Sequence, residues 1–82
     1  MPEAVFENEP DASATALQLR ELGFEAEVIL PASNTFDERT KDFFQGKAAP
    51  FQPHAIVVSD ADEERFIRTV QRHYGQVTGR VL

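Results

Sequence analysis

The densest group of side chains that could do chemistry is a run of acids in the second half of the chain: Asp60, Asp62, Glu63 and Glu64. The spacing of the first two is that of the start of an EF-hand calcium loop. That loop also needs glycine at its sixth position and glutamate at its twelfth, where this chain has Arg65 and Gln71. We therefore expect these acids to complement the positive end of a helix and not to bind a metal.

The two histidines, His54 and His73, are the other candidates for catalysis. A metal site or a nucleophilic centre would need a third ligand or a partnered nucleophile, and no serine or acid stands at a suitable spacing to either. The four glycines are scattered and form no phosphate-binding loop. We expect no catalytic residue, no metal and no cofactor.

Three arginines, Arg65, Arg68 and Arg72, follow one another at the spacing of a single helix face. Such a stripe could bind phosphate or RNA. The alternative is a solvated face whose charges pair with neighbouring acids, and we favour it because the whole domain is acidic.

Composition sets wider limits. The chain has 82 residues, 14 acids against 8 Lys and Arg, a net charge of −6 and no cysteine. It is long enough for one domain, 1–82, and it can form no disulfide. The net charge argues against nucleic-acid and membrane partners. Since no apolar run reaches the ~20 residues of a membrane span, we expect a soluble, cytoplasmic protein.

The charge is unevenly distributed. Residues 1–30 contain seven acids and one base, whereas residues 65–82 contain four arginines and no acid. The N-terminal third is therefore acidic and the C-terminal end basic.

The elements that must position these residues follow a repeated plan. Asn8 is expected to cap a first helix, whose apolar stripe ends at Leu22 and whose C-terminus is capped by Gly23. A second helix is expected after a capping box that begins at Ser59 or Asp60. An offset of 52 residues superposes the two halves. The predicted strands are 4–7, 24–30, 54–59 and 76–82, and the predicted flanking helices are 9–22 and 61–74.

This order predicts an α+β, ferredoxin-like βαββαβ sandwich with an antiparallel sheet. The segment 54–59 is apolar on both faces, which is typical of an interior strand.

Between the halves lies an insertion, 31–53, with a predicted short helix over 36–45. It is rich in phenylalanine, with Phe36, Phe43 and Phe44 on the helix. Because the strand 54–59 is apolar on both faces, the sheet face away from the two main helices needs a cover. We favour a cover by this helix of the same chain over a cover by a second subunit.

The chain resembles a family of small domains described as signal-transducing proteins. The likeness lies in a strand followed by Asn8-Glu9-Pro10-Asp11-Ala12, in Leu22-Gly23-Phe24-Glu25-Ala26, and in Ile56-Val57-Val58-Ser59-Asp60-Ala61-Asp62 before a helix. The Phe-rich insertion and the strand 76–82 depart from the family. The resemblance implies a regulatory or binding module and provides no catalytic residues.

Charges at the expected sheet edges suggest how the chain interacts. The second strand, at one edge, contains Glu25 and Glu27, and the fourth, at the other edge, contains Arg80. We predict a non-enzymatic regulatory or protein-interaction module that self-associates as a homo-oligomer, a dimer, by pairing these edges. Leu17, off the apolar stripe of its helix, is a further expected contact.

Two other functions stay open. The acidic third could act as a nucleic-acid mimic that binds a basic site on a partner protein. A small enzyme could use the open sheet face of a dimer.

Overall fold

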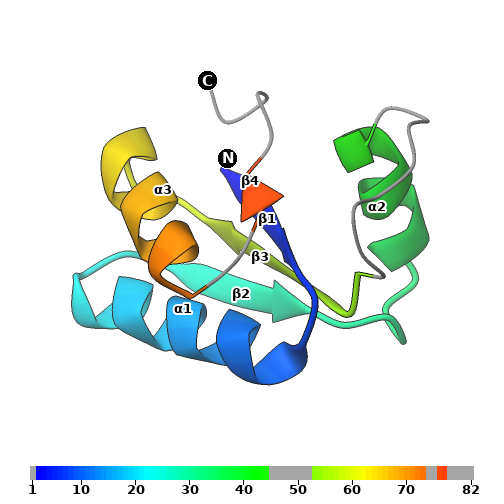
Figure 1. The fold of residues 1–82 in the computed structure, drawn as a ribbon, viewed down its shortest axis with the longest axis horizontal. Coiled ribbons are helices and arrows are strands. Elements are labelled where there is room, and N and C mark those ends of the chain that lie inside the picture. The colour runs from blue at the N-terminus through cyan, green and yellow to red at the C-terminus, as the bar shows by residue number, and fades with distance from the viewer. Residues whose placement is uncertain (1, 45–52, 74–75, 78–82) are drawn as a thin grey trace.

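The computed structural model of the chain describes residues 2–44, 53–73 and 76–77, and of Asp42, Phe43, Gln76 and Val77 it describes the backbone alone. These residues form an α+β fold with an antiparallel sheet and three helices (Figure 1). The elements are β1 (Glu3–Phe6), α1 (Glu9–Glu21), β2 (Ala26–Ile29), α2 (Phe36–Phe44), β3 (Ala55–Ser59), α3 (Glu63–Arg72) and β4 (Gln76–Val77). The α+β class predicted from the sequence is confirmed.

The strands are ordered β2-β3-β1-β4, and each neighbouring pair is antiparallel. β3 is interior, as its continuous apolar sequence predicts, and β2 forms one edge. Beside β1, the described part of β4 is two residues long. The rest of the predicted strand 76–82, with Arg80, lies outside the described residues.

The alternation of side chains along the strands divides the core in two. Ala4 and Phe6 of β1 and Val57 of β3 face α1 and α3, which lie side by side (Figure 1). Val5 and Ile56, one residue out of phase, face α2 on the opposite side. Both faces of the sheet are therefore covered by helices of the same chain.

Helix α1 begins at Glu9, as predicted, and ends at Glu21, one residue before the predicted end. The Asn8 side chain accepts a hydrogen bond from the Asp11 N–H at 2.9 Å, which satisfies a donor of the first turn. At the other end Gly23 has a φ of +96°, and the Phe24 N–H donates to the Leu19 carbonyl. A left-handed residue in this position favours glycine. Leu22 is not part of the buried stripe, since it is 45% exposed.

Helix α3 begins later than predicted. Its N-cap is Asp62, whose carboxylate accepts from the Arg65 N–H at 3.0 Å. The predicted caps are engaged elsewhere: the Ser59 hydroxyl donates to the Glu25 carbonyl at 2.5 Å, and Asp60 accepts from the Glu25 N–H at 2.8 Å. Both side chains bond the backbone of Glu25, the residue before β2. Since they are used there, the helix is capped by the later residue Asp62.

Candidate functional site

The free edge of β2 is the most distinctive surface among the described residues. β2 lies at the end of the strand order, and its strand neighbour in the described part of the chain is β3. An edge strand presents backbone N–H and C=O groups that a further strand can bind.

The hydrogen bonds around Glu25 show which groups these are. The Glu25 carbonyl accepts from the Ser59 hydroxyl and from the Asp60 N–H, so Glu25 directs its backbone toward β3. In an antiparallel pair alternate residues direct their N–H and C=O to opposite sides. Ala26 and Val28 therefore direct theirs away from β3, toward the open edge.

An open groove of about 480 Å³ lies along this edge. It is lined by Arg20, Phe24, Glu25, Ala26, Glu27 and Val58. Glu27 stands opposite Val58 in the register, and Val58 packs beside the core under α2, so the exposed Glu25 and Glu27 belong to the α2 side of the sheet. Phe24, Ala26 and Val28 pack against the core on the other side. The edge is acidic on one side and apolar on the other.

Arg20, from the last turn of α1, reaches over this edge. Its Nε and Nη2 both donate to the Ala26 carbonyl, at 3.1 and 2.7 Å. Its guanidinium therefore occupies one of the backbone acceptors that an added strand would use. Neither Arg20 nor Phe24 was among the residues predicted from the sequence, although Arg20 is conspicuous as the single base in residues 1–30.

The predicted interaction residues separate into different places. Glu25 and Glu27 are exposed at the β2 edge, whereas Leu17 is 56% exposed on α1 and lines no described part of the groove. Phe36 is buried and Phe44 half-buried against the second core. The side chain of Phe43 and all of Arg80 lie outside the described residues.

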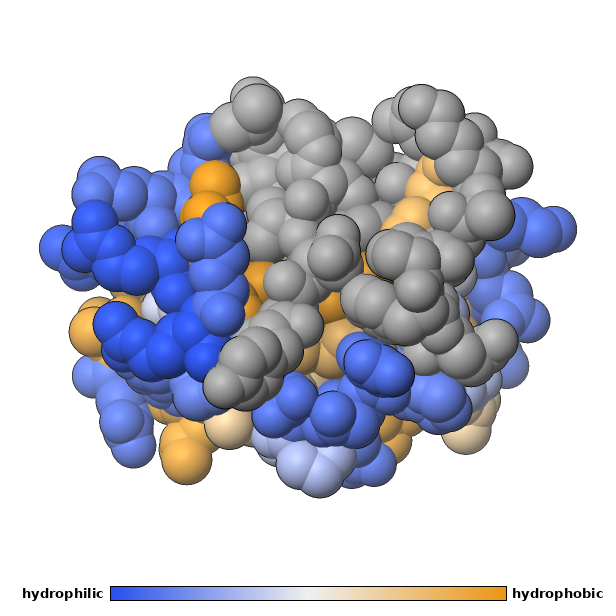
Figure 2. Space-filling model, in the orientation of Figure 1, coloured by the Kyte–Doolittle hydropathy of each residue, from blue (hydrophilic) through white to orange (hydrophobic). Residues whose placement is uncertain are grey.

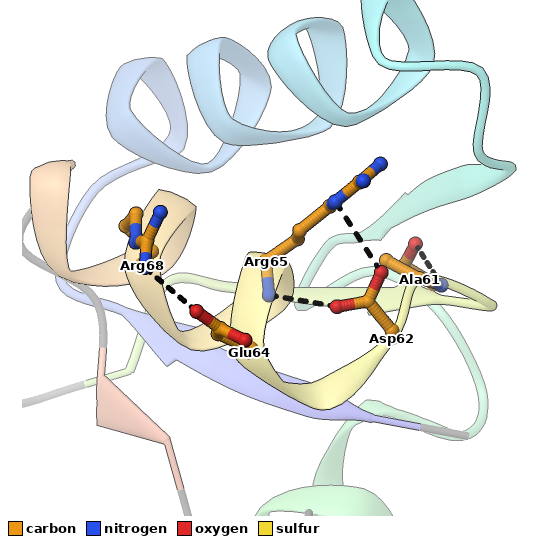
Figure 3. Close-up of polar contacts among 6 residues, drawn as sticks. Ala61, Asp62, Glu64, Arg65 and Arg68 are labelled. Carbon is orange, nitrogen blue, oxygen red and sulfur yellow. Dashed lines mark hydrogen bonds and ion pairs between the residues drawn. The ribbon is translucent and has the colours of Figure 1, made fainter.

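Two of the three arginines of α3, Arg65 and Arg68, form ion pairs with acids of the same helix or its cap. Arg68 contacts Glu64 at 2.8 Å, and Arg65 contacts Asp62 at 3.6 Å (Figure 3). Arg65 also lies over the Phe24 ring, 5.7 Å from its centroid. The surface over α3 is strongly hydrophilic (Figure 2). These contacts agree with a solvated, charge-paired face.

The histidines take part in contacts between elements. His73 caps the C-terminus of α3, and its Nε2 lies 2.9 Å from Oε1 of Gln18 on α1. The backbone N–H of His54 donates to the Phe6 carbonyl at 2.9 Å. Within residues 2–44, 53–73 and 76–77, no group of three or more acidic or histidine side chains is arranged to hold a metal ion.

Comparison with family models, with curated proteins and with solved structures found no match. The resemblance to the small signal-transducing domains is therefore supported by the sequence motifs alone. In the described part of the chain, none of the helices has the length and apolar character needed to cross a bilayer.

Proposed function

We propose that this chain is a non-enzymatic regulatory or protein-interaction module that binds an extended segment along the free edge of β2. The observation that supports this is the outward direction of the Ala26 and Val28 backbone beside an open groove. Strand addition of this kind uses main-chain hydrogen bonds for affinity and the flanking side chains for selectivity.

The strand order also supports a ferredoxin-like plan. With β4 beside β1, the chain has two β-α-β halves joined by α2, and β2 and β4 are the opposite edges. The segment that begins at β4 contains Arg80, whose charge complements Glu25 and Glu27. We take a second copy of this segment as the occupant of the β2 edge. Two copies that each place this segment on the β2 edge of the other, around a two-fold axis, form a dimer.

The other two functions receive less support. An acidic inhibitor needs its carboxylates on one surface, but Glu3 pairs with Arg39 of α2, while Asp11 contacts the Asn8 cap of α1. An enzyme on the open sheet face needs that face to be accessible, and α2 packs on it through Phe36.

The test is amide hydrogen exchange of the full chain at low and high protein concentration, read by NMR at Ala26 and Val28. We expect both amides to become protected as concentration rises, because an added strand accepts hydrogen bonds from them. Glu27→Lys should abolish this protection, whereas Glu21→Lys, the same charge change on an exposed residue of α1, should retain it. Association without protection at these two amides would contradict the proposal.

A further inference from the structure

We propose that the β2 edge selects a strand in which basic and apolar residues alternate, and that this strand displaces Arg20 from the Ala26 carbonyl. The inference rests on the proposed function, and it adds the chemistry of the partner and a residue that competes with it.

The acidic side of the edge determines which residues of the partner are basic. Glu25 and Glu27 are exposed, are two positions apart and face the same side of the sheet as Val58. Residues of an added strand directly opposite them lie about 5 Å away between Cβ atoms, close enough for opposite charges to stabilise the pair. Val58 belongs to β3, the strand between β2 and β1, and is half-buried. Its exposed carbon atoms provide an apolar surface for the methylene stems of Lys or Arg.

The other side of the edge determines the apolar positions. Phe24, Ala26, Val28 and Leu30 alternate along the chain and are partly buried against the core under α1 and α3. The residues of an added strand that face the same side lie directly beside these apolar residues. Such residues of the added strand gain most if they are apolar, because they cover carbon surface left half-exposed at the edge.

The same charges act against pairing of two β2 edges. An antiparallel pair of β2 strands centred on Glu27 places Glu27 opposite Glu27 of the second copy. A pair centred on Ala26 places Glu25 opposite Glu27. Like charges directly across a strand pair are destabilising, so these two registers between β2 strands are disfavoured, whereas a basic strand at the same edge is favoured.

Arg20 competes with the added strand for one acceptor. Its Nε and Nη2 both donate to the Ala26 carbonyl, which the strand needs for one of its own N–H groups. A charged side chain that occupies an edge in this way protects a strand from unwanted pairing. Binding therefore exchanges the guanidinium for a backbone N–H, and removal of Arg20 should tighten binding.

The experiment titrates the full chain with two fluorescent seven-residue peptides, one alternating arginine and valine and one alternating glutamate and valine. Anisotropy gives the affinities, and amide exchange at Ala26 and Val28 locates the site. We expect only the arginine peptide to bind and to protect these amides. Equal binding of the glutamate peptide would overturn the charge selection.

The displacement is tested with Arg20→Ala and, should that variant fail to fold, with Arg20→Gln. Arg68→Ala is the control, since it removes the same charge from a paired site on α3. We expect Arg20→Ala to bind the arginine peptide about two- to tenfold more tightly than Arg68→Ala, the range of one net hydrogen bond.

The outcomes separate the two proposals. If the arginine peptide binds and protects both amides but the Arg20 variants bind no more tightly than the control, the competition is wrong while strand addition stands. If neither peptide protects Ala26 or Val28 in any variant, strand addition at β2 fails, and the inference fails with it.

Discussion

Single side chains with local partners define the ends of the helices. Asn8, Asp62 and Gly23 act on backbone groups within a few residues of themselves. Such contacts depend on the immediate sequence, which is why the Asn8 and Gly23 caps could be predicted. The cap of α3 could not, because Ser59 and Asp60 bind Glu25, 34 and 35 residues away in sequence. A residue with two possible partners is assigned only when the tertiary structure is known.

The Asn8 cap gives a prediction at this scale. Asn8→Ala removes the acceptor for the Asp11 N–H and should lower the free energy of unfolding by about 0.5–2 kcal/mol. Urea denaturation followed by circular dichroism measures this. Asn8→Asp keeps an oxygen at the cap and should cost less, and Asn34→Ala, at an exposed turn position, should change little. Equal losses for Asn8→Ala and Asn34→Ala would contradict the capping role.

The Arg20 contact is the part of the candidate site that local sequence could not predict. Arg20 and Ala26 are six residues apart, but their contact requires that β2 return alongside α1 in the register that it adopts with β3. The acidic residues of the same edge were predicted because their alternation with Ala26 and Val28 is visible in the sequence.

Among the elements, α2 shows most clearly what can and cannot be predicted from the sequence. The helix was predicted from its phenylalanine spacing, and the apolar faces of β3 predicted that something must cover the sheet. The packing partner could not be deduced, because phenylalanines suit a subunit interface as well as a core. In the structure Phe36 packs with Val5, Ile29 and Ile56 of the same chain.

α2 is therefore expected to contribute to the stability of the single chain. Phe36 is only 5% exposed, and Phe36→Ala should lower the free energy of unfolding by about 3–5 kcal/mol, as for other core phenylalanines. Phe44→Ala is the matched control on the same helix and should cost less, because Phe44 is half-buried. Chemical denaturation at two protein concentrations measures both. A loss for Phe36→Ala that appears only at high concentration would assign Phe36 to an interface between copies.

For the molecule as a whole, the net charge of −6 matters less than the position and the partner of each acid. Glu3 is paired with Arg39, Asp62 caps α3 and Glu64 contacts Arg68, so these carboxylates already have partners within the chain. Glu25 and Glu27 are exposed at the β2 edge. Other acids, such as Glu7, Glu21 and Asp37, are exposed on other elements. Glu25 and Glu27 differ from these in lying beside backbone groups that are also open, and this coincidence favours the β2 edge as the interaction site.

The proposed association between copies should therefore depend on salt. In a dimer whose copies exchange the segments that contain Arg80, two contacts form between Arg80 and the glutamates, each worth about 0.2–1 kcal/mol when exposed. Screening is much stronger at ~500 mM than at ~50 mM salt, so the association constant should fall by at least about twofold between them. Light scattering and sedimentation measure it. Arg80→Gln should associate more weakly and lose the salt dependence, since the screened charge is gone. An equal response of the wild type and Arg80→Gln would show that other charges, or none, hold the copies together.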